Sequence, residues 1–293
     1  MMRRLLIAFA LSLWSLTAFC GPLGGISAPD PYIVTEFPGQ AYGNSNAAPL
    51  TPASSVIPNT WAVVVVLGQS LGASNAQGTY STISANAKML SIYGGVYPCT
   101  GPVLGASFLG VAGSNVNSPI CQIADGLISG GAFPGVLMVP ISINGTAVAD
   151  WNGPQLSSRI KAIWNRMVAL GLTTNHPIYV MWHQGEQDAF LGTPAAAYTT
   201  SLQSVASQWR SLGYTGPFIV ATETVQGGVA NSSIAAAQAA AVSAPLHIVL
   251  GANWDSLTGG TNRYDGTHPT AAGAIAFANL DVTVITNCHN TSC

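Results

Sequence analysis

Residues of the types that catalyse ester chemistry lie at two distant places in the chain. Ser70 follows a run of apolar residues at 61–67, and Asp265 and His268 belong to one short Asp-Gly-Thr-His segment. Acyl transfer needs a nucleophilic hydroxyl, an imidazole that accepts its proton, and a carboxylate that orients the imidazole. These residue types predict Ser70 as the nucleophile, His268 as the general base and Asp265 as the group that orients it.

Two further polar segments follow apolar runs, namely Asn144-Gly145-Thr146 and the six residues from His183 to Asp188. The carboxyl ends of parallel strands lie along one edge of a sheet, so such segments can converge although they are distant in sequence. Gly145 has no side chain, and its N–H can therefore approach a substrate closely. We expect it to donate a hydrogen bond to the oxyanion of an acyl-transfer reaction.

The elements that must position these residues alternate along the chain. Residues 61–67 include four consecutive valines and end at Gly68, which indicates a strand buried on both faces. If residues 72–76 begin a helix, Ser70 also lies near the positive end of a helix dipole. Residues 71–125 should hold a helix, a short strand and long loops. The alternation predicts an α/β domain with a central parallel sheet, with further strands at 136–143, 177–182, 217–222 and 246–250 and helices near 154–170, 194–212, 232–243 and 270–284.

Taken in order, the motifs Gly-Gln-Ser, Asn-Gly-Thr…Trp, His-Gln-Gly-Glu-x-Asp and Asp-Gly-x-His resemble those of the SGNH hydrolase superfamily. Within it they are similar to the branch of sialate O-acetylesterases and plant-type acetylxylan esterases, over roughly residues 61–286. The resemblance implies a flavodoxin-like three-layer α/β/α fold and the same Ser70, His268 and Asp265 triad. It also implies an oxyanion hole formed by the N–H groups of Ser70 and Gly145 and the side chain of Gln184.

The chain departs from that pattern at Leu71, Asn144 and Gln187, where the branch often has Asn, Gly and Ser. Together with Gln69, these medium-sized side chains predict a cramped pocket that accepts acetyl and rejects longer acyl chains. We expect Gln69 and Asn144 to contact the substrate. Trp151, six residues after Gly145, is the best candidate for stacking on a sugar ring.

Carboxylates near the site admit two interpretations. Glu186 and Asp188 are expected to anchor their own loop, because buried carboxylates need partners. Alternatively they could bind a metal ion with His183, Asp265 and His268, but the spacing matches no recognised metal motif. We therefore expect neither metal nor cofactor. A packing or hydrogen-bonding role is expected for His183, and structural roles for the other histidines, His176, His247 and His289.

The first twenty residues have the features of a secretory signal. Arg3 and Arg4 precede an apolar stretch that is too short to span a bilayer, and small residues at Ala18 and Cys20 allow cleavage before Gly21. A lipoprotein acylated on Cys20 is the less favoured reading, because Phe19 is bulky. We expect a secreted or periplasmic protein with no transmembrane segment after cleavage.

After the signal, four cysteines remain, an even number that favours disulfides in an exported chain. Four cysteines allow three pairings, and we favour the nearest neighbours in sequence, Cys99 with Cys121 and Cys288 with Cys293. A zinc site is the alternative, but no two of these cysteines have the C-x-x-C spacing.

The composition of the chain argues against some classes of binding partner. Only 6% of the residues are charged and the net charge is −2, which argues against nucleic acid or an anionic membrane as a partner. Residues 21–60, rich in Pro, Gly and Ser, are expected to form an arm or linker, and residues 61–293 the catalytic domain. The sequence predicts a monomeric, secreted carbohydrate O-acetylesterase. An O-acetyltransferase with the same triad and a non-catalytic polysaccharide-binding module are the rival interpretations.

Overall fold

The run of valines forms the centre of the main sheet. In the computed structural model, which describes residues 41–42, 57–92, 94–108 and 117–293, strand β2 (Ala62–Gly68) is buried at every residue. It pairs in parallel with β6 (Val136–Pro140) on one side and with β7 (Ile178–His183) on the other. Because both neighbours are strands and both faces are covered, only an apolar run such as this one fits.

The main sheet has seven strands in the order β4-β3-β6-β2-β7-β8-β9. The five parallel strands β6-β2-β7-β8-β9 follow the flavodoxin-like order 2-1-3-4-5, in which the strand order reverses between β2 and β7. Strand β3 extends this sheet in parallel beside β6, and β4 pairs with β3 antiparallel at the edge. The remaining strands are β3 (Ala87–Leu90), β4 (Val96–Pro98), β8 (Phe218–Thr222) and β9 (Ile248–Asn253).

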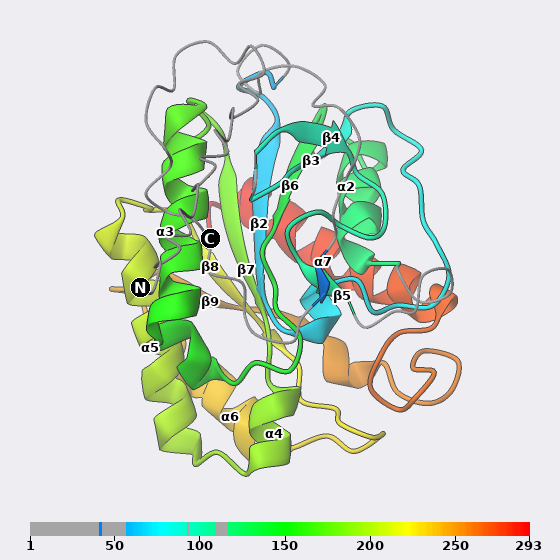
Figure 1. The fold of residues 1–293 in the computed structure, drawn as a ribbon, viewed down its shortest axis with the longest axis vertical. Coiled ribbons are helices and arrows are strands. Elements are labelled where there is room, and N and C mark those ends of the chain that lie inside the picture. Colours follow the sequence, from blue (N-terminus) through cyan, green and yellow to red (C-terminus); the bar gives the residue numbers. More distant parts are fainter. Residues whose placement is uncertain (1–40, 43–56, 93, 109–116) are drawn as a thin grey trace, which may run out of the picture. The chain divides into compact units, whose positions relative to one another are not determined.

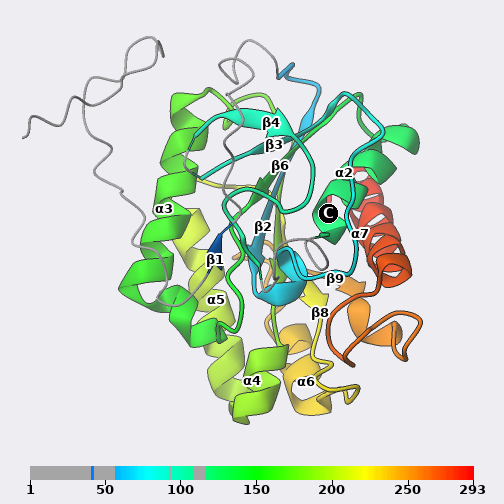
Figure 2. The same ribbon diagram turned by 45° about the vertical axis from the view of Figure 1, so that its right-hand side comes forward.

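Helices cover both faces of the sheet (Figures 1 and 2). Val63, Val65 and Leu67 of β2 pack into a core with one set of helices, while Val64 and Val66 face the other set. The predicted three-layer α/β/α fold is therefore confirmed. On the first face lie α3 (Pro154–Ala169), α5 (Ala195–Ser211) and α6 (Ser232–Ala240), and on the second α2 (Pro119–Ser129) and α7 (Ala271–Thr291).

Short elements fill the connections at the carboxyl ends of the strands. They are η1 (Ser70–Gly72) after β2, η2 (Val148–Asn152) after β6, α4 (Glu186–Leu191) after β7 and η3 (Trp254–Ser256) after β9. A separate pair, β1 (Ala41–Tyr42) and β5 (Ser107–Phe108), joins part of the 21–60 segment to the domain. The predicted signal segment, Cys20 and most of residues 21–60 lie outside the described residues.

Three boundaries differ from the predictions. Residues 72–76 form no helix; the chain makes only the three-residue turn η1 before Ala76 bridges to Asn117, so no helix dipole points at Ser70. Strand β9 begins at Ile248, because His247 takes a left-handed turn with φ of 46°. Helix α7 continues to Thr291 because Ile285 and Cys288 still pack against the core.

Helix α7 is the one helix among the described residues that is long and apolar enough to cross a membrane. By length and composition alone it could, with a mean hydropathy of 1.3. In the structure it packs against α2 and buries Phe277, Ile285 and the carboxyl group of Asp281. This is the environment of a core helix in the domain.

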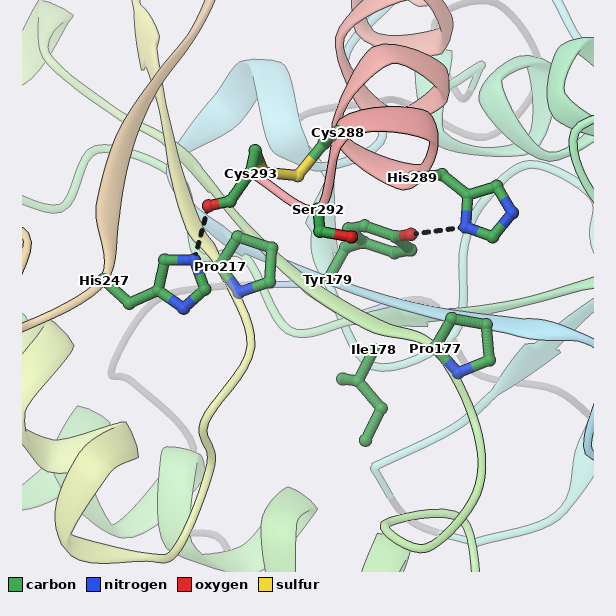
Figure 3. A pocket seen from close by; sticks show the side chains of 9 residues that line it. All are labelled: Pro177, Ile178, Tyr179, Pro217, His247, Cys288, His289, Ser292 and Cys293. Carbon is green, nitrogen blue, oxygen red and sulfur yellow. Dashed lines mark hydrogen bonds between the residues drawn. A yellow bond between two sulfur atoms is a disulfide. The ribbon is translucent and has the colours of Figure 1, made fainter.

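Cys99 is bonded to Cys121 and Cys288 to Cys293, which are the nearest-neighbour pairs. The second bond closes the end of α7 beside a pocket of about 300 Å³ at the strands' amino ends (Figure 3). In that pocket His247 Nε2 lies 2.7 Å from the Cys293 carbonyl oxygen. The pocket is at the opposite end of the sheet from Ser70, because β2 and β7 run in parallel and Ser70 follows their carboxyl ends.

Candidate active site

Asp265 and His268 form a direct pair. The Oδ2 atom of Asp265 lies 2.7 Å from Nδ1 of His268, while Oδ1 accepts hydrogen bonds from the main-chain N–H groups of Thr267 at 2.8 Å and His268 at 2.7 Å. Burial alone would raise the pKa of Asp265, but the hydrogen bonds from His268 and Thr267 lower it below its usual range. The carboxylate is thus ionised and fixes the orientation of the imidazole, whose Nε2 has no hydrogen-bond partner among the described residues.

The loop that carries this pair is tied to its neighbours by main-chain bonds. Gly228 N donates to Gly266 O at 2.8 Å, which connects the loop to the segment after β8. Gln77 N donates to Pro269 O at 2.9 Å, which connects it to the segment after η1. The segment that follows Ser70 and the loop of Asp265 and His268 are therefore bonded to each other, although they are almost 200 positions apart in the sequence.

Ser70 lies at the carboxyl end of β2, beside the point where the strand order reverses. Gly68 is required before it, because φ is 126° and a Cβ there would lie 1.9 Å from the His183 carbonyl oxygen. The next residue, Gln69, donates its N–H to that carbonyl at 2.6 Å. Leu71 packs with Trp254 and with Phe277 of α7, so the turn is pinned on both sides.

Ser70 and His268 make no hydrogen bond to each other within the described part of the chain. Their segments share one end of the sheet and the Gln77–Pro269 bond. The side chain of His268 is 14% exposed and that of Asp265 is 41% exposed. Solvent can therefore reach the pair at the surface of the domain.

Main-chain donors are available at the expected positions. Over the described ranges, the N–H groups of Ser70 and Gly145 donate to no other described group. Gly145 is exposed with φ of 64°, and nothing lies within 4 Å of the position that a Cβ would take. Asn144 is buried beside it, and its Oδ1 accepts a hydrogen bond from Asn75 Nδ2 at 2.7 Å.

The expectation for the Gln184 side chain is corrected. Gln184 is fully buried, and its Nε2 donates to Asp188 Oδ2 at 2.5 Å, to Thr146 O at 3.1 Å and to Gln69 Oε1 at 3.2 Å. Because its two amide hydrogens are already donated, Gln184 has none left for an oxyanion. Asp188 also accepts from Val148 N at 2.8 Å, which joins η2 to the turn after β7. Its placement is that of an anchor.

Gln184 instead orients a different amide. The Oε1 atom of Gln69 accepts from Gln184 Nε2 and from Gln187 N, the latter at 3.0 Å. Because these two donors fix the oxygen of the Gln69 amide, its Nε2 points away from Gln184 and Gln187. Among the described residues, Gln69 Nε2 has no hydrogen-bond acceptor. Gln69 Nε2 can therefore donate a hydrogen bond to a substrate bound at the neighbouring Ser70.

The prediction for Trp151 is wrong. Its side chain is 0% exposed, packs edge-on against Trp182 with ring centroids 5.8 Å apart, and donates Nε1 to Thr146 Oγ1 at 3.1 Å. Residues 148–152 form a turn that directs the indole into the core beneath α3 and α5. A buried ring cannot stack on a sugar.

A cluster of buried acids lies behind the site. His183 Nδ1 lies 2.9 Å from Glu223 Oε2, and His183 Nε2 lies 3.4 Å from Asp281 Oδ2. Burial raises the pKa of Glu186 and Glu223 well above their usual range, with their mutual repulsion adding to the shift at Glu186. Burial also raises the pKa of Asp281 to about 6. Glu186 is fully buried, which places it inside the domain.

No group of three or more His, Cys, Asp or Glu side chains placed to hold a metal ion occurs in the described ranges. His183 belongs to the buried cluster, whereas Asp265 and His268 pair at the surface. The other histidines bond to structural groups: His176 to Trp61 O, His247 to Thr215 O and Cys293 O, and His289 to the Tyr179 hydroxyl.

Four supporting residues were not singled out from the sequence: Asn75, Glu223, Arg263 and Asp281. Asn75 Nδ2 donates to Ser70 O at 2.8 Å as well as to Asn144, and so connects two motifs. Asn75 lies in the polar stretch that follows Gly-Gln-Ser, and this position could have marked it as a residue of the site. Glu223 and Asp281 are single charged residues close to apolar runs, which are rare unless they are paired.

The chain resembles known proteins in sequence and in fold. Residues 117–280 match the family of carbohydrate esterases described as sialic acid-specific acetylesterases. No curated protein matches the chain by sequence. A solved structure shares its fold. A protein from Arabidopsis thaliana aligns with a TM-score of 0.60 and 16% identity, over 79% of this chain and 99% of its own.

Two further solved structures align with lower scores. An acetylxylan esterase from Geobacillus stearothermophilus aligns with a TM-score of 0.49 and 12% identity, over 78% of this chain and 96% of its own. A lipase/acylhydrolase from Enterococcus faecalis aligns with a TM-score of 0.47 and 13% identity, over 77% and 95%.

The strand order and the motif-bearing edge define the class, an α/β domain of flavodoxin-like topology, and the Arabidopsis structure shares this fold. The family match covers more than half of the 293 residues and includes Asn144, His183 and the Asp265–His268 pair, although it begins after Ser70. The chain belongs to the sialic acid-specific acetylesterase family of carbohydrate esterases.

Proposed function

We propose that this protein is an exported serine esterase that removes O-acetyl groups from a carbohydrate without a cofactor. The observation that carries the proposal is the Asp265–His268 hydrogen bond of 2.7 Å, in a loop bonded to the segment that follows Ser70. An aspartate that orients an imidazole, in a segment that shares one end of the sheet with a strand-end serine, supports an acyl-transfer site, which needs these three groups together.

In the proposed reaction, Ser70 Oγ attacks the acetyl carbonyl carbon and His268 Nε2 takes the hydroxyl proton. The negative charge that develops on the carbonyl oxygen is stabilised by the N–H groups of Ser70 and Gly145 and by Gln69 Nε2, which takes the part first expected of Gln184. As the C–O bond to the sugar breaks, His268 returns the proton to the leaving oxygen. Water then attacks the acetyl-serine and His268 accepts its proton; as the bond between the acyl carbon and Ser70 Oγ breaks, His268 returns that proton to Oγ, and acetate leaves.

The surroundings of Ser70 support a short acyl group. Gln69, Ser70 and Leu71 are each less than 5% exposed, and Asn144 is held by Asn75. Well-packed side chains of this kind leave little room for added methylene groups. The sugar is expected to bind outside this packed region, where Gly145 and Asp265 are exposed.

The location and domain organisation belong to the same proposal. Residues 1–20 are proposed as a signal peptide, 21–60 as an arm and 61–293 as the catalytic domain. Two disulfides within the domain support export, because disulfides persist in oxidising compartments.

The test is acetate release from acetylated xylo-oligosaccharides, with and without an unacetylated oligosaccharide as acceptor. The proposal predicts stoichiometric acetate in both reactions. Acetyl groups recovered on the acceptor would identify an acetyltransferase. Binding of the oligosaccharide without any acetate release would identify a non-catalytic module.

A further inference from the structure

Arg263 is a buried arginine two residues before Asp265. It is 2% exposed and donates to three main-chain carbonyl oxygens: Leu257 O at 2.8 Å, Thr267 O at 2.5 Å and Trp254 O at 2.9 Å. Its guanidinium carbon also lies 4.8 Å from the centre of the Phe277 ring. One side chain thus connects η3, α7 and the loop that carries the pair.

The three carbonyl acceptors explain why a buried cation is tolerated here, because a buried charge needs hydrogen-bond partners. Burial disfavours the charged form and lowers the pKa of Arg263, while attraction from Glu186 and Glu223 opposes that shift. Guanidinium is the one side chain that offers several fixed donors together with a permanent charge. Lysine, with a single nitrogen, could not reach three carbonyls that surround it on different segments.

The contact with Thr267 has a specific consequence. Thr267 O and His268 N belong to the same peptide group. Arg263 Nη1 binds the oxygen of that group at 2.5 Å, and its N–H donates to Asp265 Oδ1 at 2.7 Å. A cation on the oxygen polarises the peptide and strengthens its N–H as a donor, since hydrogen bonds in a chain reinforce one another.

We infer that Arg263 is the positioning residue of the Asp265–His268 pair and acts through the peptide group between Thr267 and His268. The inference rests on the proposed esterase function. Arg263 touches neither substrate nor reacting atoms; it holds the Asp265 carboxylate at the angle from which Oδ2 orients the imidazole.

Arg210 provides a matched control at the other end of the sheet. Its guanidinium also donates to three main-chain carbonyls, Leu246 O at 2.9 Å, Tyr214 O at 2.7 Å and Gly216 O at 2.7 Å, and lies 4.7 Å from the Tyr214 ring. Leu246 and Gly216 directly precede His247 and Pro217, which line the pocket of Figure 3 at the amino ends of β9 and β8. The two arginines therefore share their bonding chemistry but not their position.

The experiment compares Arg263→Lys with Arg210→Lys in the full chain, after the unmodified protein has been shown to hydrolyse p-nitrophenyl acetate. Both variants lose thermal stability. Only Arg263→Lys is expected to lose kcat, by about ten- to a hundred-fold with KM within twofold, because small misplacements of catalytic groups have effects of this size. The low-field proton NMR signal of the imidazole N–H bonded to Asp265 should weaken in that variant alone.

Equal kcat values in the two lysine variants, or a loss in Arg263→Lys that only follows the unfolded fraction, would overturn the inference. If Arg263→Lys does not fold, Arg263→Gln, which keeps a neutral donor toward Thr267 O, is compared with Arg210→Gln by the same measurements and the same criterion. Absence of activity in the unmodified protein would instead refute the proposed function, so the two failures are distinguishable.

Discussion

Replacing Asp265 by asparagine separates the chemical role of the carboxylate from its structural role. The Oδ1 atom accepts the N–H groups of Thr267 and His268, and an asparagine oxygen can keep both bonds. The Oδ2 atom, 2.7 Å from His268 Nδ1, becomes an NH₂ group that cannot accept a hydrogen. The imidazole must then carry its proton on Nε2, where it can no longer accept one from Ser70.

The expected loss in kcat is about 10⁴-fold, the size found when an orienting aspartate in a serine triad is amidated. This corresponds to about 5 kcal/mol in the activation free energy. KM should change little, because the substituted atom faces His268 rather than the acyl group. The free energy of unfolding should fall by about 1 kcal/mol or less, since both main-chain bonds persist and the side chain is 41% exposed.

The assay is p-nitrophenyl acetate hydrolysis, with urea unfolding of the same samples. Asp265→Ala is the companion variant: it also removes the two main-chain bonds, so it should be less stable than Asp265→Asn without recovering activity. His268→Ala should be more severe than either, because the base contributes more than its orienter. An Asp265→Asn enzyme that keeps kcat within tenfold of wild type would refute the proposed role of Asp265.

Three other outcomes are expected. The free energy of unfolding should fall as the pH rises from about 4 to 6, because folded Asp281 holds its proton to a pKa of about 6 while the unfolded carboxyl group ionises near 3.9. Asp281→Asn should remove that decline and raise the free energy of unfolding at pH 8 by about 1 to 3 kcal/mol. An unchanged urea-unfolding profile in this variant would contradict the assignment. Trp151→Ala should lower the free energy of unfolding by about 3 to 5 kcal/mol as a core truncation, and a selective rise in KM for oligosaccharides in Trp151→Phe with normal stability would show a sugar contact instead. The value of kcat/KM should fall steeply from acetyl to butyryl to octanoyl p-nitrophenyl esters; faster octanoyl hydrolysis would exclude the cramped acyl pocket.

The parts of the fold that depend on local pattern could be predicted from the sequence. The valines of β2 and the amphipathic face of α3 gave strands and helices within a few residues of those observed. The turn after Ser70 could not be predicted, because residues 72–76 are shaped by distant partners: Ser74 Oγ accepts from Val103 N, and Asn75 binds Ser70 O. Contacts of this kind leave no periodic signal in the sequence.

The same distinction holds in the site. Asp265 and His268 are three residues apart, so a local motif was enough to pair them. Gln184 and Trp151 were misjudged because their roles depend on which way a side chain points. Gln184 turns inward to Asp188, and Trp151 turns into the core against Trp182. Motif spacing contains no information about either direction.

The central claim is that Ser70 is the nucleophile, and Ser70→Ala tests it most directly. The hydroxyl lies at a strand end in a turn fixed by main-chain bonds and by Leu71, so its removal should leave urea unfolding almost unchanged. The account predicts that kcat for p-nitrophenyl acetate falls by at least about 10³-fold in this folded variant, and that mass spectrometry under turnover shows an acetyl group on Ser70 of the unmodified protein and none on the variant. Near-wild-type turnover by folded Ser70→Ala would contradict the account.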